Sequence, residues 1–398
     1  MLGLAYLLSR DRRAVSLRAV LSGVALQWLL ALFVLRSGVG QAIVRALAEV
    51  VQSVLDMTFE GSAFVFGPLG QASGGESGLG VIFAFQVLPT IIFVASLFAV
   101  LYHLGVMQLI VRGFAQVTVR LFGVSGAESL VVVASVFMGQ TEAPLTIRPY
   151  LDSLTESELF TVMVAGMASV SGAILGAYVL VGQVSIEHLL TAVAMTAPIS
   201  LTMAKIIVPE SASSETAGAA PEVEGASSRN VLDAAATGAG EGLTLALNVG
   251  AVLIAFIALI ALINLMLALL CDYVGASVYT LEQLLGWGFS PLAALMGVPW
   301  SEATQVGGVL GTRTVVNELI AFDQLRLLGP ALSERSRAIA TFAICGFANF
   351  SSIGIQIGGL GVIVPSRKAD IARLGLLALA AATLANFSTA CVAGALLP

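Results

Sequence analysis

Six residues inside an apolar segment decide how this chain folds: Gly139-Gln140-Thr141-Glu142-Ala143-Pro144, within residues 131–150. A carboxylate in such a segment is costly unless it faces a cavity, a partner or a ligand, so Glu142 is a candidate functional residue. Gly139 and Pro144 both disfavour a continuous helix, and they free backbone groups that only protein or water can satisfy. The stretch therefore predicts a broken membrane hairpin with a polar tip.

A similar arrangement occurs in the second half of the chain. Residues 307–318 form another glycine-interrupted apolar segment, and its carboxylate is Glu318. The helix that follows each hairpin contains the pattern Gly-x-Ala-[Ser/Asn]-x-Ser, at 166–171 and at 346–351. Matching interruptions in two halves of a membrane protein indicate inverted repeats that meet at a transport site.

The composition indicates an integral membrane protein. Of 398 residues, 58% are hydrophobic and 11% are charged, whereas soluble domains have about 25% charged residues. The net charge of −6 comes without a basic block, so nucleic-acid binding has no support. Cys271, Cys345 and Cys391 are far apart in apolar surroundings, which favours core packing over a disulfide or a metal site.

Six segments have the length and apolar character of membrane spans. They are residues 20–35, 81–104, 159–180 (broken near Ser169), 189–208, 243–270 and 374–397. Basic residues between 10 and 18, and again between 365 and 373, mark the cytoplasmic side, because cytoplasmic loops are enriched in Lys and Arg. Both basic segments predict the same orientation.

The other segments complete the expected architecture. Residues 1–8 form a helix too short to cross, 42–55 an interfacial helix, 67–80 a loop, 107–122 an amphipathic surface helix and 284–298 a shorter apolar helix. The hairpins cover 127–151 and 302–325, and a second broken helix covers 336–364. Thr155 and Glu158 form a capping box before the first broken helix.

The expected division of the chain follows the two repeats. Residues 1–122 hold N-terminal, scaffold and interfacial helices, and 123–208 form the first repeat with its hairpin, broken helix and one scaffold span. Residues 209–229 are a flexible polar linker. Residues 230–300 supply further scaffold helices, and 301–398 form the second repeat with its hairpin, broken helix and last span.

Four motifs in this order resemble the concentrative nucleoside transporter family in its bacterial type. They are Gly-Gln-Thr-Glu-Ala-Pro-Leu at 139–145 and the segments 317–322, 345–353 and 365–373. The resemblance implies an all-α, multi-pass protein of the bacterial inner (plasma) membrane, with two re-entrant hairpins and two broken helices. It also implies a homotrimer with an elevator mechanism that imports nucleosides by cation symport, without a cofactor besides the coupling ion. Family members begin with one full helix where this chain has residues 1–8, so the number of spans stays open.

The resemblance also implies a substrate site. The positions that match nucleobase contacts are Gln140, Thr141, Glu142 and Ile174. The positions that match ribose contacts are Glu318, Asn349 and Ser352, and Phe347 matches the aromatic that packs against the nucleoside. The residue chemistry agrees, because two vicinal hydroxyls can donate hydrogen bonds to one carboxylate beside an amide. Two acidic groups without an arginine clamp disfavour phosphorylated substrates.

The coupling ion depends on one position in this resemblance. Sodium-coupled members have an asparagine where this chain has Ser135, while the other sodium ligands match the Met138 and Val170 carbonyls and the Ser169 hydroxyl. Proton-coupled members have serine there, so the sequence favours proton coupling, with sodium as the alternative. Glu142 is then the expected proton carrier, because apolar surroundings favour a neutral carboxyl group.

Other functions remain as weaker hypotheses. An intramembrane enzyme needs a nucleophile with a base or a metal motif, and the two histidines, His103 and His188, form neither. A channel fits two occluding hairpins less well than alternating access does. An elevator-type carrier of another small polar solute, such as an amino acid, would need a cationic group facing the substrate carboxylate. A purely structural role of Glu318, paired for instance through Arg313, is also open.

Overall fold

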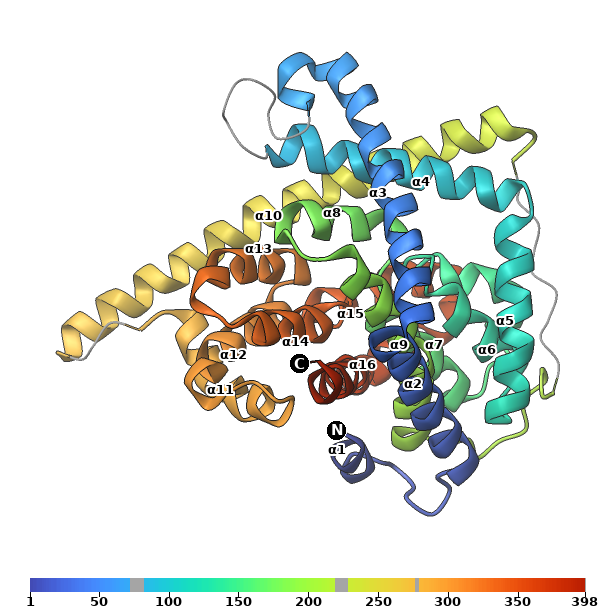
Figure 1. The fold of residues 1–398 in the computed structure, drawn as a ribbon. Helices are drawn as coiled ribbons and strands as arrows, with labels where there is room; N and C mark the ends of the chain where they lie inside the picture. Colours follow the sequence, from blue (N-terminus) through green and yellow to red (C-terminus); the bar gives the residue numbers. More distant parts are fainter. Residues whose placement is uncertain (72–81, 219–227, 276–278, 398) are drawn as a thin grey trace.

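The computed structural model is a bundle of α-helices (Figure 1). The structure describes residues 1–71, 82–218, 228–275 and 279–397, and the β-structure among them is one bridge pair, Ser125 with Ala217. The helices of the first half are α1 (Leu2–Leu7), α2 (Leu17–Arg36), α3 (Gly38–Phe66), α4 (Leu88–His103), α5 (Val106–Phe122), α6 (Gly126–Ala134), α7 (Glu156–Ala168), α8 (Gly172–Gly182) and α9 (Ile186–Ile207).

The second half continues with seven α-helices in the described residues. They are α10 (Val231–Val274), α11 (Leu281–Leu295), α12 (Trp300–Val315), α13 (Glu318–Leu328), α14 (Glu334–Ile344), α15 (Phe350–Ile363) and α16 (Lys368–Leu396). Short 3₁₀ or π turns are η1 (Gly67–Gly70), η3 (Phe83–Val87), η4 (Ala143–Tyr150), η5 (Gly329–Ala331) and η6 (Pro365–Arg367).

Six stretches of the described chain are long and apolar enough to cross a membrane, and each overlaps a predicted span. They are Leu17–Arg36, Phe83–His103, Glu156–Gly182, Ile186–Ile207, Val231–Tyr273 and Pro365–Leu396. The most apolar of them is α10, which packs lengthwise along α4 (Figure 1). None of its most apolar 18-residue window is buried within the chain. A helix this apolar and exposed needs lipid or another chain around it.

The predicted interfacial helix over 42–55 is longer in the structure. Its helix, α3, begins at Gly38 and ends before Gly67, whose φ of 60° lies in the left-handed region that glycine adopts at low cost. The chain stays helical past residue 55, since Asp56 and Glu60 lie on the exposed face of α3. The predicted loop over 67–80 begins as the short η1 turn, and its residues 72–80 lie outside the described residues.

The basic segment 365–373 is expected from its charges to be a cytoplasmic loop, and this predicted loop is too long. The turn η6 ends at Arg367, and α16 already begins at Lys368. Asp370 accounts for this early start, because it pairs with Arg367 at 2.9 Å and with Arg373 at 3.0 Å, both at helical i, i+3 spacing. The charges that marked a loop in the sequence therefore stabilise the first turns of a helix.

The two basic segments meet at one end of the molecule, as the orientation argument predicts. Arg10 pairs with Glu156 at the start of α7, and Arg373 donates to the same carboxylate at 3.1 Å. Arg367 also donates to the Leu154 carbonyl at 2.6 Å. We use this end as the cytoplasmic reference for the bundle.

Both predicted hairpins are present as pairs of short arms. The first joins α6 to η4 through turns at 135–142, and its second arm is 3₁₀ rather than α-helical. Pro149 explains this difference, since it lies inside the arm and cannot donate the backbone hydrogen bond that an α-helix requires there. The second hairpin joins α12 to α13, and Asn317 caps α13 by accepting a hydrogen bond from the Ile320 amide at 2.9 Å.

Both predicted helix breaks are confirmed. The first lies between α7 and α8, where Ser169 has extended backbone angles (φ −95°, ψ 177°). The second lies between α14 and α15, where Asn349 is extended (φ −138°, ψ 167°) and caps α15. The capping box of Thr155 and Glu158 at the start of α7 is confirmed as well.

The buried core consists of two large clusters that interlock the repeats. One cluster joins the second hairpin with α8 and α14, and the other joins the first hairpin with α7 and α15. Each hairpin thus packs against one half of each broken helix. The last helix, α16, contributes residues to both clusters. This packing brings the two breaks together in the middle of the bundle.

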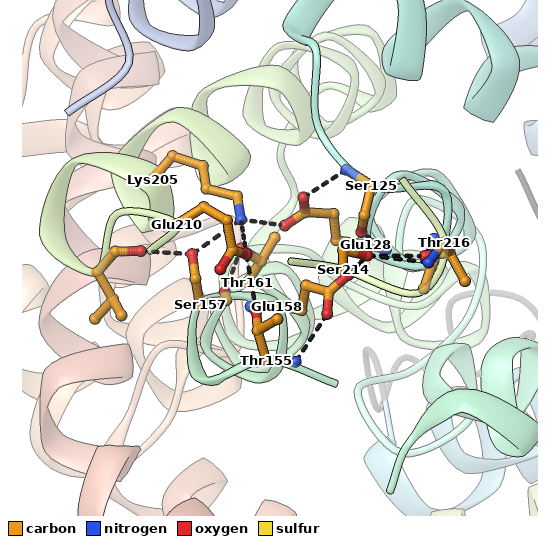
Figure 2. Close-up of polar contacts among 12 residues, drawn as sticks. Ser125, Glu128, Thr155, Ser157, Glu158, Thr161, Lys205, Glu210, Ser214 and Thr216 are labelled. Atoms are coloured by element: carbon orange, nitrogen blue, oxygen red, sulfur yellow. Dashed lines mark hydrogen bonds and ion pairs between the residues drawn. The ribbon is translucent and has the colours of Figure 1, made fainter. Parts of the chain in front are cut away.

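A buried polar cluster holds the base of the first hairpin (Figure 2). We call it the hairpin-base cluster and define it as Glu128, Ser157, Lys205 and Glu210. The Lys205 ammonium group on α9 lies 2.7 Å from Glu128 on α6 and 3.5 Å from Glu210, and it donates to the Ser157 hydroxyl on α7 at 2.9 Å. One lysine therefore connects three elements around the hairpin.

The segment after α9 covers this cluster. Ser214 donates to the Glu158 carboxylate at 2.5 Å, and Thr216 accepts hydrogen bonds from the Gly126 and Ala127 amides at 2.9 and 3.1 Å (Figure 2). These amides belong to the first turn of α6, where backbone donors lack partners within the helix. Residues 210–217, the first part of the expected linker, are thus anchored to the bundle.

Candidate functional site

The two helix breaks cross each other and contact the first hairpin. The Phe347 amide in the second break donates to the Ser169 carbonyl in the first at 3.2 Å. The Gly172 amide at the start of α8 donates to the Phe137 carbonyl in the hairpin turn at 3.1 Å. Backbone groups that the breaks free are therefore satisfied by the other break and by the first hairpin, as buried polar groups require.

A set of polar side chains gathers on one side of this crossing. Asn349 donates to the Glu318 carboxylate at 2.9 Å and accepts from the Ser352 amide at 2.9 Å and the Ser351 hydroxyl at 2.6 Å. The Ser352 hydroxyl donates to the Phe347 carbonyl. Glu318 and Asn349 are both buried. The hydrogen-bonded set thus joins Ser351 to four predicted substrate residues, Glu318, Phe347, Asn349 and Ser352.

The first hairpin joins this set through Gln140. Its amide donates to the Ser352 hydroxyl at 3.2 Å. Its Cβ packs so closely on α7 that a Cβ at Gly166 would lie 3.0 Å from it. Thr141 lies next to α15, because a Cβ at Gly359 would be 2.5 Å from its methyl group. The hairpin tip therefore rests on both broken helices.

The remaining predicted substrate residues lie outside this hydrogen-bonded set. Glu142 is exposed in the chain, and its carboxylate accepts one hydrogen bond, from the Gly139 amide at 3.1 Å. Ile174 is buried on α8, in the same apolar cluster against which Phe347 packs. Within the described residues, no hydrogen bond or ion pair links Glu142 to Glu318, Asn349 or Ser352.

The predicted ion site offers several uncommitted oxygens. The Ser135 hydroxyl is buried without a hydrogen-bond partner, and in the described chain no hydrogen bond uses the Met138 or Val170 carbonyls. Ser169 donates its hydroxyl to the Ala165 carbonyl at 2.7 Å, which leaves the oxygen lone pairs for another partner. Oxygens of this kind suit a hard cation or a water molecule.

Three further polar residues near the breaks, Gln356, Tyr178 and Asn386, were missed by the sequence reasoning, and a fourth, Arg313, was considered only as a possible structural partner of Glu318. Gln356 on α15 and Tyr178 on α8 are buried, and each has one side-chain oxygen without a partner. Arg313 on α12 and Asn386 on α16 are completely buried and hydrogen-bonded to each other. A usable signal existed for two of the missed residues, since Gln356 and Asn386 are polar residues inside apolar helices.

Several buried polar atoms around the crossing thus lack a partner within the chain. They include the Ser135 hydroxyl, the Gln140 and Gln356 carbonyl oxygens and the Tyr178 hydroxyl. Buried polar groups are normally hydrogen-bonded, so such a concentration in one region indicates a site for water, an ion or a polar ligand. Its acceptors, together with the Glu318 carboxylate, suit a ligand that carries hydroxyl or N–H donors.

Comparison with known proteins agrees with this site. Three family models match in order: the Na⁺ dependent nucleoside transporter N-terminus at residues 1–69, a nucleoside recognition domain at 84–184, and the Na⁺ dependent nucleoside transporter C-terminus at 188–394. The chain is 43% identical over 394 residues to the uncharacterized transporter YutK of Bacillus subtilis, which covers 99% of this chain and 96% of YutK.

Two further relatives are a protein named for its substrate and a protein whose structure has been solved in a defined conformational state. The chain is 40% identical over 397 residues to the nucleoside permease NupC of Helicobacter pylori, covering 98% of this chain and 94% of the permease. It is 40% identical to CNTnw, solved in an inward-facing substrate-bound state, with a TM-score of 0.92 over 100% of this chain and 97% of that one. The chain is thus a multi-pass membrane transporter rather than an enzyme, and it belongs to the concentrative nucleoside transporter family.

Proposed function

We propose that this protein imports nucleosides across the bacterial inner membrane, driven by an inward cation gradient. The observation that carries the proposal is the hydrogen-bonded set of Gln140, Glu318, Asn349 and Ser352, assembled from both repeats. A ribose brings two vicinal hydroxyls that can donate to the Glu318 carboxylate, while Asn349 and Ser352 donate or accept beside it.

The nucleobase binds on the first-hairpin side in this proposal. Gln140 keeps an unpaired carbonyl oxygen for a base N–H, and Thr141 and Glu142 lie next to it on the hairpin tip. Ile174 and Phe347 supply the apolar surface against which the flat base and the sugar pack. Binding through several buried hydrogen bonds rejects close analogues strongly, because a missing hydroxyl leaves protein groups unpaired.

Nucleotides are excluded by charge. Glu142 and Glu318 are the acidic groups of the proposed site, and Arg313, the buried arginine near it, is already hydrogen-bonded to Thr383 and Asn386. A phosphate would meet like charge without a free cationic partner, which is costly in buried surroundings.

Protons are the coupling ion that we favour. Ser135 replaces the asparagine that provides an amide oxygen in sodium-coupled relatives, and a hydroxyl reaches less far and is a weaker dipole. Glu142 then carries the proton, since its carboxylate lies at the tip of the first hairpin and has a single hydrogen-bond partner. Alternation between a neutral and an ionised Glu142 would link the proton to substrate binding.

Sodium coupling is the second candidate, and a specific observation favours it. The Met138 and Val170 carbonyls accept no hydrogen bond within the described chain, and the Ser135 hydroxyl has no partner. With the Ser169 hydroxyl they make four oxygens from two adjoining segments. Several oxygens with a water in place of the lost amide could still hold a sodium ion.

We also propose a homotrimer that works by an elevator mechanism. The exposed apolar surface of α10 suits a scaffold helix that faces neighbouring copies and lipid. Residues 1–122 and 230–300 would then supply most of the scaffold. The hairpins and broken helices of the repeats at 123–208 and 301–398 would form the moving domain, and the first repeat would add one scaffold span. The anchored segment 210–217 would move with the first hairpin.

One uptake experiment tests the substrate. Purified protein in proteoliposomes is given labelled uridine, adenosine and an acidic amino acid under an inward proton or sodium gradient. The expected result is uptake of the labelled nucleosides. Unlabelled nucleosides should inhibit this uptake by competition, and nucleotides should not. Uptake of the amino acid alone would replace the proposal by a carrier of another polar solute.

A further inference from the structure

A second polar assembly, centred on α16, contacts the same helix crossing. The Asn386 side-chain amide donates to the Ala168 carbonyl at 2.7 Å and to the Cys345 carbonyl at 3.1 Å. These carbonyls belong to the last residue of α7 and the residue that ends α14, so one amide group satisfies an open backbone acceptor at each helix break.

Arg313 holds this amide in place from the second hairpin. Its guanidinium donates to the Asn386 side-chain oxygen and to the Thr383 hydroxyl, the latter at 3.2 Å, and lies 6.0 Å from the centre of the Phe387 ring. The side chain is fully buried, and the ion pairs of the described chain do not include it. The Glu318 carboxylate stabilises its charge electrostatically without forming an ion pair, and a buried cation held mainly by hydrogen bonds is expensive, which indicates a specific task for it.

The helix crossing is closely packed at Gly346. A Cβ at Gly346 would lie 2.5 Å from both the Ala168 carbonyl oxygen and the Asn386 side-chain oxygen. Cys345 precedes Gly346, and Phe347, Asn349 and Ser352 follow within six residues. A shift of Asn386 would therefore be passed directly to the residues that read the ribose.

The second hairpin reaches the crossing at two points. Near its tip, Glu318 on α13 accepts from Asn349, and on its first arm Arg313 donates to Asn386. With both contacts made, Glu318 and Asn349 keep a fixed separation. We infer that Arg313 and Asn386 are positioning residues, a brace that holds the two helix breaks and the second hairpin in the geometry that reads ribose hydroxyls. The inference deepens the proposed function and rests on it.

The test uses Asn386→Asp and a matched control. Aspartate has the same shape and keeps an acceptor for Arg313, but it cannot donate to the Ala168 and Cys345 carbonyls. The control is Ser388→Ala on the same helix, whose hydroxyl donates to Gln27 at 3.3 Å, away from the breaks. Half-saturating concentrations are measured for uridine, 2′-deoxyuridine and 3′-deoxyuridine in proteoliposomes.

The expected result is selective for the sugar. In Asn386→Asp the half-saturating concentration for uridine rises about tenfold, the size of one lost buried hydrogen bond, while that for the deoxy sugars rises less. The preference for ribose therefore shrinks. In Ser388→Ala both quantities stay as in the unmodified protein. A loss of maximal rate in Asn386→Asp with an unchanged preference for ribose would overturn the inference, since a merely structural role has that signature.

A second measurement does not depend on transport. Cys345 is buried beside the brace, so in a Cys271→Ser/Cys391→Ser background its labelling by a small maleimide reports loosening of the break. Labelling is expected to be several-fold faster in Asn386→Asp than in Ser388→Ala, and equal rates would overturn the brace. If the unmodified protein takes up no uridine, the proposed substrate fails, and the labelling still decides whether the brace exists.

Discussion

The ammonium group of Lys205 lies 2.7 Å from a carboxylate oxygen of Glu128, and the side chains are 5% and 1% exposed. Glu128 also accepts from the Ser125 amide at 2.8 Å, where it completes a capping box at the start of α6. The pair therefore fixes both the position and the first turn of the hairpin arm that leads to Gln140.

Lys205→Met is predicted to destabilise the protein strongly. It leaves Glu128 as a buried charge without its cation, and breaking one partner of a buried pair costs about 3–5 kcal/mol. The measurement is the unfolding midpoint of the purified protein in detergent. Lys205→Met/Glu128→Leu removes both charges and should recover part of the loss.

An exposed ion pair provides the control for this prediction. Arg45 and Glu187 are 3.9 Å apart with side chains 67% and 48% exposed, and surface pairs of this kind contribute little. Arg45→Met should leave the midpoint unchanged. Equal midpoints for Arg45→Met and Lys205→Met would contradict a stabilising hairpin-base cluster.

Glu318→Gln is predicted to reduce nucleoside uptake severely without unfolding the protein. The amide keeps the size of the side chain but replaces a charged acceptor, and a hydrogen bond to a charged group contributes about 1.5–3 kcal/mol. Uptake at low substrate concentration should therefore fall by roughly tenfold or more. Near-normal uptake by the variant, with an unchanged melting profile, would remove Glu318 from the site.

Gly346→Ala is predicted to disrupt the crossing of the broken helices. The added methyl group would lie 2.5 Å from the Ala168 carbonyl oxygen, and backbone at a packed crossing cannot move aside cheaply. Gly354→Ala on α15 is the control, because a Cβ there has nothing within 4 Å. Alanine in a helix interior should be neutral or stabilise by about 0.5–1 kcal/mol.

Transport and unfolding midpoint are measured for both glycine variants. We expect Gly346→Ala to lower both, and Gly354→Ala to change neither unfavourably. If the two variants behave alike, the close approach at Gly346 is not what holds the breaks together.

The polar interruptions of the apolar segments made most of the fold predictable. The breaks near Ser169 and at Asn349 follow from small and polar residues inside spans, which leave backbone groups to be satisfied elsewhere. Helix ends were harder to predict, because the charges at 368–373 read as a loop while their i, i+3 pairing stabilises a helix. Local pattern alone could not choose between these two effects.

The candidate site was predictable only in part. Glu318, Asn349, Ser352 and Gln140 stand out as polar residues in apolar surroundings, and the structure brings them together. Asn386 stands out as a polar residue in the last apolar span, but only the packing of α16 against both breaks brings its amide to the Ala168 and Cys345 carbonyls. A contact over such sequence distances is a property of the tertiary fold rather than of any local pattern.

The coupling ion gives the last prediction, and Ser135→Asn is its central variant. If proton coupling holds, uptake by the unmodified protein follows an imposed inward proton gradient and continues when sodium is replaced by choline. Asparagine at 135 adds an amide oxygen beside the uncommitted Met138 and Val170 carbonyls, so the variant should gain sodium dependence. Glu142→Gln cannot release a proton and should abolish the response to pH, or stop transport altogether.

The same proteoliposomes also test whether the proton-coupling hypothesis is wrong. Membrane potential is clamped with potassium and valinomycin, so that a pH step acts on the proton gradient alone. Uptake by the unmodified protein that requires sodium and ignores the pH step would mean that Ser135, Ser169 and the two carbonyls still bind the cation. Glu142→Gln should then retain sodium-driven uptake, because its carboxylate would contact substrate without carrying the coupling proton.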